Sequence, residues 1–232
     1  MSTEHKLSSD AEIPAVYSWP ELRKRWGKEL RFPDLDIDVM RHGETELNRA
    51  DLVTGQMDVA LSSTGREQGR MMGTFLRPPY EAIFASTQRR SIETLCSALR
   101  ARGLPEVYES DHRLNERSLG VMEGKPRVFV PEFAAGDLDF APVGGESYRC
   151  VAQRCLSFLL DLHQSSRYWS ADRRVLICSH MGPLRVLIAI WTGEHDAARM
   201  MAQEWKNALK FRLTVSTVEW PPFLGWRVVG SL

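Results

Sequence analysis

Two histidines and two arginines closely follow segments that read as strands: Arg41, His42, Arg90 and His180. An arginine side chain presents forked N–H donors that match the oxygens of a phosphate group. A neutral imidazole can act as a nucleophile near neutral pH. A single histidine at a strand end is more often a hydrogen-bonded structural residue, so the chemistry depends on these side chains meeting in one place. Together these residue types predict an anion site that holds phosphate and contains a histidine nucleophile.

The chain around these residues alternates between expected strands and expected helices. Strands are expected at 36–40, 82–85, 174–178, 211–219 and 226–229, and helices at 64–76, 88–100, 146–168 and 183–191. Thr64 and Glu67 have the spacing of a capping box at the start of one helix. Such alternation predicts an α/β domain, a three-layer α/β/α sandwich with a largely parallel central sheet. Ligands of such sheets bind beyond the carboxyl ends of the strands, which is where the histidines and arginines are expected to meet.

The first 35 residues are expected to form an N-terminal arm, ahead of a single domain at 36–232 that carries the site. Within the arm, residues 18–30 place apolar side chains at helical spacing, which predicts a short amphipathic helix. Ser18 and Glu21 have the spacing of a capping box for this helix. The arm could pack on the domain, cover the site as a lid, or form a dimer contact.

Short motifs follow one another along the chain at characteristic spacing. They are Arg41-His42-Gly43-Glu44-Thr45 with Asn48, Thr54-Gly55 with Asp58, Ser86 with Arg90, Leu114-Asn115-Glu116-Arg117, Gly145-Glu146-Ser147 and Ser179-His180. The tripeptide R-H-G alone is a weak signal, but the complete ordered set is highly specific. In this set the chain resembles the histidine phosphatase superfamily, also called the phosphoglycerate mutase-like family. The resemblance implies a histidine phosphatase catalytic domain at 36–232.

The resemblance also implies a role for each matched residue. His42 is similar to the nucleophile that becomes phosphorylated, and Glu116 to the proton donor for the leaving oxygen. The other implied members of the site are the catalytic His180 and the substrate-binding residues Arg41, Asn48, Thr54, Gly55, Arg90 and Met181. Arg89, the neighbour of Arg90, is expected to be solvated. Met181 departs from the family pattern, which usually has a small glycine there, and its side chain could narrow the mouth of the site.

The expected chemistry needs neither a metal ion nor a cofactor. A phosphoryl group carries charge on three equatorial oxygens, and enzymes mainly position it and neutralise that charge. Two arginines and a second histidine can do so by themselves. His42 needs one free ring nitrogen, so the other should donate to a backbone carbonyl such as that of Gly43. The remaining histidines are scattered and are expected at the surface: His5, His112, His163 and His195.

Three functions fit this set of residues. The first is a phosphatase that hydrolyses a small phosphate monoester through a phosphohistidine intermediate. The second is a phosphoglycerate-type phosphomutase, which returns the phosphoryl group to its substrate, and the third is an inactive binding protein on the same fold. Related mutases have a long basic insertion where this chain has only the short interval from Lys125 to Gly144, which favours hydrolysis. The complete catalytic set disfavours the inactive protein.

The sequence does not identify the substrate, which could be a sugar phosphate, a nucleotide or another small metabolite. The candidates for contacting the leaving group are Gln56, Met57, Arg117, Met181 and the segment 125–144. Lys125 and Arg127 bring positive charge to that segment. The alternative is that these are ordinary loop residues.

Composition sets the outer limits of function. The chain has 232 residues, with 30 Lys and Arg against 30 Asp and Glu, so its formal net charge is zero and neither nucleic acid nor membrane is expected as a partner. No signal peptide is expected, and the apolar run Val186 to Trp191 is too short to cross a bilayer. The four cysteines have no C-x-x-C pair and are expected as buried free thiols rather than as disulfides or zinc ligands. A cytoplasmic location follows, and a homodimer is possible.

Overall fold

The computed structural model describes residues 21–22, 35–129, 137–166, 173–192, 210–214 and 226–230. The helix expected at 18–30 therefore lies outside the described residues apart from Glu21 and Leu22. The Leu22 side chain is fully buried in the larger core cluster, whose other members lie between Ile37 and Ile190. This contact favours an arm that packs on the domain.

Six strands form one sheet in the order β3-β2-β4-β1-β5-β6. Their bounds are β1 Leu35–Arg41, β2 Ala82–Ala85, β3 Glu109–Ser110, β4 Arg173–Ser179, β5 Lys210–Thr214 and β6 Trp226–Gly230. Strands β3, β2, β4 and β1 pair in parallel, whereas β5 and β6 are antiparallel to their neighbours. The expected largely parallel sheet is confirmed. The short polar strand β3 was not expected, because two exposed residues give no apolar pattern.

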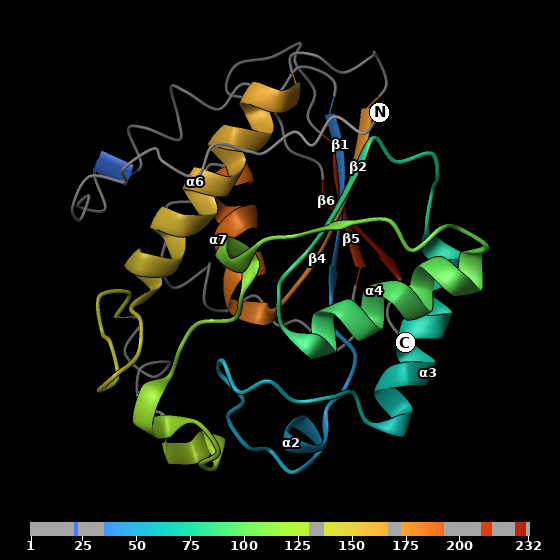
Figure 1. Ribbon diagram of the computed structural model, residues 1–232. Coiled ribbons are helices and arrows are strands. Elements are labelled where there is room, and N and C mark those ends of the chain that lie inside the picture. The colour runs from blue at the N-terminus through green and yellow to red at the C-terminus, as the bar shows by residue number, and fades with distance from the viewer. Residues whose placement is uncertain are drawn as a thin grey trace, which may run out of the picture.

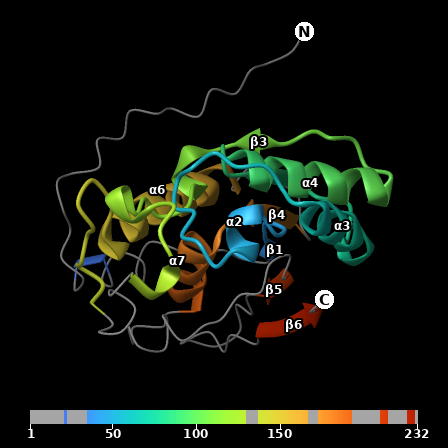
Figure 2. The ribbon, with the colours of Figure 1, turned by 90° about the horizontal axis from the view of Figure 1, so that it is seen from below.

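Helices cover both faces of the sheet. They are α2 Glu46–Arg49, α3 Ser63–Met72, α4 Arg89–Arg102, α6 Tyr148–Ser166 and α7 Met181–Thr192, with short 3-10 turns η1 Gly73–Phe75, η2 His112–Leu114, η3 Gly120–Met122 and η4 Arg127–Phe129. Helices α6 and α7 lie on one face and α3 and α4 on the other, in both views (Figures 1 and 2). This is the expected three-layer sandwich.

The start of α3 corrects one expectation. The N-cap is Ser62, whose Oγ accepts a hydrogen bond from the N–H of Gly65 at 3.0 Å, and the helix begins at Ser63 rather than with a Thr64–Glu67 capping box. The α-helical part ends at Met72 and continues as the 3-10 turn η1 to Phe75. A complete capping box lies elsewhere, between Thr45 and Asn48 at the start of α2.

Two apolar clusters flank the sheet, one on each face. Along β4, Val175 and Ile177 join the cluster beneath α6 and α7, whereas Leu176 and Cys178 join the cluster beneath α3 and α4. Because both faces are covered, the strand reads as a continuous apolar run rather than as an alternating one.

All four cysteines are free thiols, as expected, but they are not all buried. Cys155 and Cys178 are fully buried, and burial raises the pKa of each thiol to about 12. Cys96 is half-buried and Cys150 is exposed, which corrects the expectation for these two. Cys150 is exposed because it lies in the first turn of α6, off the apolar face.

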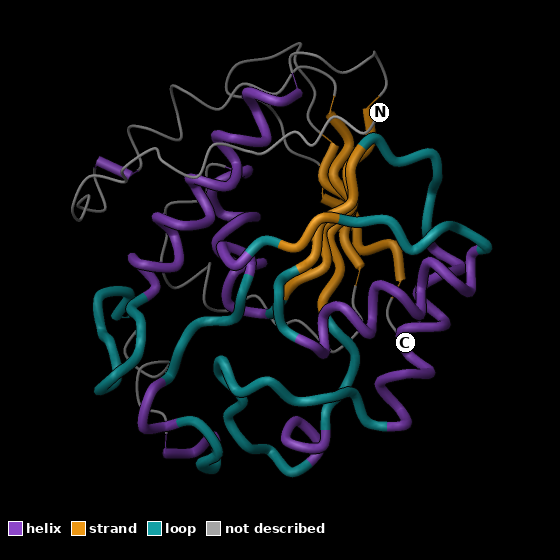
Figure 3. The backbone as a smooth tube through the Cα atoms, viewed as in Figure 1, coloured by secondary structure: helices purple, strands orange, loops and turns teal. Residues whose placement is uncertain are grey.

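The loops that follow the parallel strands gather at one edge of the sheet, below the strands in Figure 3. Two backbone hydrogen bonds continue the strand pairing into these loops. The N–H of His42 donates to the carbonyl of Ser179, and the N–H of Ser86 donates to the carbonyl of Cys178, both at 3.0 Å. The ends of β1, β2 and β4 are thereby held side by side.

Candidate active site

The two expected catalytic histidines meet at this edge. His42 directly follows β1, and His180 lies between β4 and α7. Their ring centroids are 5.0 Å apart, with the ring planes tilted by 52°. The Nδ1 atom of His42 donates to the carbonyl of Gly43 at 2.6 Å, which confirms the expected contact. This bond fixes the tautomer and makes Nε2 of His42 the unprotonated ring nitrogen, the one that can attack.

Burial keeps both imidazoles neutral. His42 is 2% exposed and His180 is fully buried. Burial, and then the charges of Arg90 and Arg41, hold the pKa of His42 well below its usual range. The pKa of His180 is lowered in the same way, first by burial and then by Arg90. A lowered pKa means that His42 is unprotonated at neutral pH, the state that a nucleophile needs.

His180 supports the site from behind the pocket. Its Nε2 atom lies 2.6 Å from the Oγ of Ser86, the first residue after β2. Its Nδ1 atom is buried and has no hydrogen-bond partner among the described residues. The Ser86 contact ties the end of β2 to the end of β4, and therefore orients the second imidazole.

Two buried arginines supply positive charge. Burial lowers the pKa of Arg41 and of Arg90 to about 10, and Glu116 opposes that shift in both, so both side chains remain charged at neutral pH. The Arg90 guanidinium donates to the carbonyls of Met57 and Gly55, both at 2.8 Å. Its Nε–H has no hydrogen-bond partner within the described part of the chain. Two carbonyls thus fix the guanidinium in place.

Arg89 behaves as expected. It is 60% exposed and pairs with Glu93 at 2.6 Å, one turn along α4. The side chain of its neighbour Arg90 is fully buried. The two adjacent arginines therefore have opposite environments, because they lie on opposite faces of the same helical turn.

A pocket at His42 is lined by the expected site residues with the exception of His180. Those that line it are Arg41, His42, Asn48, Thr54, Gly55, Arg90, Glu116 and Met181, joined by Val53, Arg117, Leu119, Arg127, Tyr148 and Gly182. The half-buried Met181 side chain thus forms part of the wall. Asn48 Nδ2 lies 3.5 Å from the Oγ1 of Thr54, so α2 and the following loop present these two side chains together.

Gly55 is required by its backbone and by its surroundings. Its φ is +51°, a conformation that L side chains rarely adopt. A Cβ atom there would lie 2.2 Å from Oε1 of Glu123. The glycine lets the loop turn tightly enough for its carbonyl to accept from Arg90.

Glu116 enters the pocket from the loop after η2. Its Oε1 accepts from the N–H of Arg117 at 2.9 Å and from the N–H of Gly182 at 3.1 Å. Its own N–H donates to Oε1 of Gln88 at 2.8 Å, and the same oxygen accepts from Arg90 at 3.2 Å. Gln88 thus joins the expected proton donor to Arg90, the arginine expected to bind phosphate. Gln88 was not among the residues expected at the site, although its position two residues before Arg90 indicated that it lies close by.

Two more arginines line the pocket in different ways. Arg117 is 2% exposed; its guanidinium donates to the carbonyls of Glu146 and Phe140 and stacks 4.6 Å from the ring of Tyr148. Arg127 is 41% exposed and pairs with Asp51 at 3.2 Å. Arg117 is therefore a wall residue, whereas Arg127 brings an accessible positive charge.

Backbone bonds hold the wall that carries Arg127. The N–H of Val53 donates to the carbonyl of Lys125 at 2.9 Å, and the N–H of Gly124 donates to the carbonyl of Val53 at 2.8 Å. Lys125 itself is exposed and does not line the pocket. The loop at 51–55 and the segment after Gly124 thus form one connected wall.

The part of the chain that the structure describes contains no group of three or more His, Cys, Asp and Glu side chains suited to a metal ion. His112 is exposed, as expected, whereas His163 is half-buried, which corrects the expectation of a surface residue. His5 and His195 lie outside the described residues. None of the described helices has the length and apolar character needed to cross a membrane.

Comparisons with known proteins agree with this geometry. Glucosyl-3-phosphoglycerate phosphatase of Mycolicibacterium vanbaalenii is 34% identical over 167 residues, which are 67% of this chain and 73% of that protein. The 2,3-bisphosphoglycerate-dependent phosphoglycerate mutase of Cytophaga hutchinsonii is 31% identical over 159 residues, 65% of this chain and 74% of that protein.

Solved structures show the same relationship. Mycobacterial glucosyl-3-phosphoglycerate phosphatase in complex with VO3 superposes with a TM-score of 0.69 at 28% identity, covering 84% of this chain and 98% of that one. The histidine phosphatase superfamily (branch 1) matches residues 37–220, most of the chain. The chain belongs to the histidine phosphatase superfamily.

Proposed function

We propose that this chain is a phosphatase that hydrolyses a small phosphate monoester through a phosphohistidine on His42. One observation carries the proposal: a buried, neutral His42, with Nδ1 committed to the Gly43 carbonyl, lies in a pocket with two charged arginines and a carboxylate. The relatives named above include phosphatases whose names specify a small phosphorylated substrate, which supports the proposal. We assign the chain to the phosphoric monoester hydrolases of the histidine acid phosphatase type.

The reaction would proceed in two steps. In the first, Nε2 of His42 attacks phosphorus, the ester P–O bond breaks, and the Glu116 carboxyl gives its proton to the leaving oxygen. Arg41 and Arg90 would neutralise the charge on the phosphoryl oxygens, and His180 and Asn48 would help to orient them. In the second step the Glu116 carboxylate takes a proton from water, whose oxygen attacks phosphorus and releases His42 and inorganic phosphate.

The proposal includes a metal-independent reaction. Arg41 and Arg90 place two positive charges in the pocket, which is the task that a divalent cation performs in other phosphoryl-transfer sites. Dialysis against a chelator should therefore leave phosphate release unchanged, and a loss that magnesium or zinc restores would contradict this part of the proposal. Free buried thiols are typical of proteins from a reducing compartment, which supports a cytoplasmic location.

A phosphomutase is the second candidate, because one relative bears that name. A mutase must retain the dephosphorylated intermediate and keep water away from the phosphohistidine. The interval from Lys125 to Gly144 has only two basic residues, and Lys125 is exposed outside the pocket. With 3-phosphoglycerate and a catalytic amount of the bisphosphate, we expect release of inorganic phosphate to exceed isomerisation. Isomerisation much faster than phosphate release would identify a mutase instead.

We further propose that the substrate carries a second anionic group beside the phosphate. Arg127 is the most accessible positive charge in the pocket wall, and its partner Asp51 is itself 77% exposed. Both curated relatives named above have a glycerate unit in the substrate of their names, which supplies a carboxylate.

A matched pair of substrates tests this proposal. 3-Phosphoglycerate and glycerol 3-phosphate share the ester but differ in whether a carboxylate or an alcohol lies at the other end. We expect kcat/KM for 3-phosphoglycerate to exceed that for glycerol 3-phosphate by about tenfold or more, which is the effect of a typical hydrogen bond to a charged group. The Arg127→Gln variant should remove this preference. Equal kcat/KM values for the two esters in the parent protein would contradict the proposed second anionic group. They would not contradict the proposed hydrolysis.

A further inference from the structure

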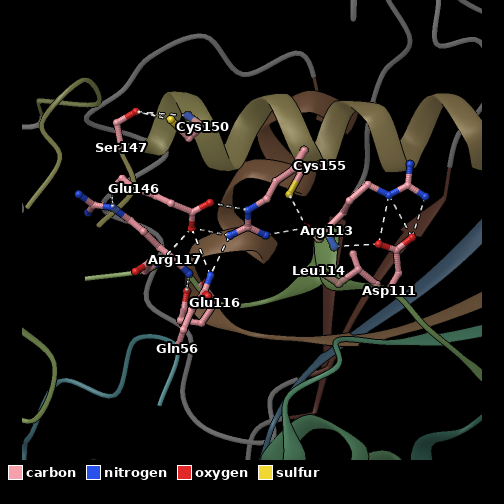
Figure 4. A network of polar contacts seen from close by, with 12 residues as sticks. Gln56, Asp111, Arg113, Leu114, Glu116, Arg117, Glu146, Ser147, Cys150 and Cys155 are labelled. Atoms are coloured by element: carbon pink, nitrogen blue, oxygen red, sulfur yellow. Dashed lines mark hydrogen bonds and ion pairs between the residues drawn. The ribbon is translucent and has the colours of Figure 1, made fainter. Parts of the chain in front are cut away.

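The backbone around Glu116 is anchored by a polar network that reaches the start of α6 (Figure 4). The Glu116 carbonyl accepts from Nε2 of Gln56 at 2.9 Å and from Nη2 of Arg154 at 3.3 Å. Its N–H is taken by Gln88, as described above. The peptide groups on both sides of the Glu116 Cα are therefore fixed, and the side chain starts from a defined position.

Glu146 organises the donors to that carbonyl. Its Oε1 accepts from Nε of Arg154 at 3.1 Å, and its Oε2 accepts from Nη2 of Arg154 at 3.3 Å and from the N–H of Ser118 at 2.9 Å. Arg154 also donates Nη1 to the carbonyl of Arg113 at 2.6 Å. The ion pair thus contacts the chain before, at and after Glu116.

This ion pair is more than a surface feature. The side chains of Arg154 and Glu146 are only 13% and 25% exposed. Charge-assisted hydrogen bonds in such partly desolvated positions are stronger and better ordered than exposed pairs. Neither residue is among those that line the pocket.

We propose that Glu146 and Arg154 are positioning residues that hold the proton donor Glu116 in register with the leaving oxygen; this inference rests on the proposed function. Oε1 of Glu116 already accepts two backbone N–H groups, so Oε2 is the oxygen that carries the proton to be donated. A displacement of about 1 Å in a catalytic group can cost on the order of a hundredfold in rate. Loss of the ion pair should therefore weaken proton donation while the nucleophile stays intact.

Leaving-group dependence separates this role from a general loss of structure. The first step forms the N–P bond at His42 and breaks the ester bond, with the proton moving from Glu116 to the departing oxygen. Nitrophenolate needs little protonation, whereas an alkoxide needs it fully. The quantity to measure is kcat/KM, because it reports the steps up to departure of the leaving group and excludes hydrolysis of the intermediate.

The experiment compares Arg154→Gln and Glu146→Gln with the parent on para-nitrophenyl phosphate, phenyl phosphate and 3-phosphoglycerate. We expect kcat/KM for 3-phosphoglycerate to fall by about ten- to a hundredfold, that for phenyl phosphate to fall less, and that for para-nitrophenyl phosphate to stay within about threefold. Arg154→Lys keeps the charge but not the forked donors, so its kcat/KM for 3-phosphoglycerate should lie between those of the parent and of Arg154→Gln. Gln56→Ala removes an exposed donor to the same carbonyl and should show the same trend more weakly, even if the ion-pair variants fold poorly.

Asp161→Asn is the matched control. Asp161 lies on α6 with Arg154, is 27% exposed, and pairs with Arg113 at 2.5 Å rather than with Glu116. This control should leave the ratios of kcat/KM among the three substrates unchanged. The positioning role would be overturned if the ion-pair variants lost the same factor in kcat/KM on all three substrates, or if they lost none. Absence of phosphate release or of a phosphohistidine in the parent would instead overturn the proposed function.

Discussion

His42→Ala is expected to lower kcat by more than about a hundredfold, because removal of a nucleophile typically costs far more than that. The imidazole is buried and neutral, and its Nδ1 bond to Gly43 directs Nε2 away from the strand. We do not expect another group in the pocket to replace it, since the arginines remain charged and Glu116 serves as the proton donor. The measurement is steady-state release of phosphate from para-nitrophenyl phosphate in the presence of a chelator.

Trapping of the intermediate supplies the second readout. Parent protein quenched during turnover of a radiolabelled ester should carry acid-labile phosphate, and His42→Ala should carry none. His180→Ala should retain at most a trace of turnover, because it removes the buried ring that lies 5.0 Å from His42. Arg89→Ala is the control, since this exposed neighbour of Arg90 should leave the rate within about twofold. More than about a hundredth of the parent rate in His42→Ala would rule out the covalent mechanism.

The fold is accessible from sequence because its signals are local and agree with each other. The strands expected at 36–40 and 174–178 lie within β1 and β4. Residues 175–178 form a continuous apolar run, as expected for a strand covered on both faces, whereas in 36–40 two aspartates alternate with apolar residues. Parallel pairing then forces the residues after these strands to one edge. His42 and His180 meet for that reason, and not through any signal in the intervening 137 residues.

Details that depend on distant partners are not accessible in the same way. Ser62 and Thr64 are equally suitable cap residues by sequence, and Thr64 has the better-placed glutamate. Ser62 is the cap in the structure, where its hydroxyl also donates to Oε1 of Glu44 at 2.8 Å. This tertiary contact selects Ser62 rather than Thr64 as the N-cap.

The same reason explains the pocket wall. Arg117 is a candidate for contacting the leaving group by its position next to Glu116, but the carbonyls of Glu146 and Phe140 engage its guanidinium. Those acceptors lie more than twenty residues away and carry no side-chain pattern. Arg127, in contrast, becomes a wall residue because backbone bonds join its segment to Val53 and Asp51. Backbone acceptors and donors of this kind are invisible to residue-type reasoning.

Glu116→Gln is expected to separate substrates by their leaving groups. The amide keeps the size of the side chain and can still accept from the N–H groups of Arg117 and Gly182, but it cannot give a proton. General acid catalysis contributes about 10²- to 10⁴-fold, so kcat/KM for 3-phosphoglycerate should fall by that amount. For para-nitrophenyl phosphate the loss should be at most about tenfold, because nitrophenolate departs with little help.

Two carboxylates serve as controls for this result. Glu44 follows His42 closely in sequence, but its Oε1 accepts from Ser62 and it does not line the pocket, so Glu44→Gln should not depend on the leaving group. Glu146→Gln should reproduce the Glu116→Gln pattern in weaker form, because it releases the donor without removing the proton. If Glu116→Gln lowers kcat/KM equally for both substrates, the carboxyl has a structural role and the proton comes from another group. A leaving-group effect in Glu44→Gln with none in Glu116→Gln would identify Glu44 as the acid.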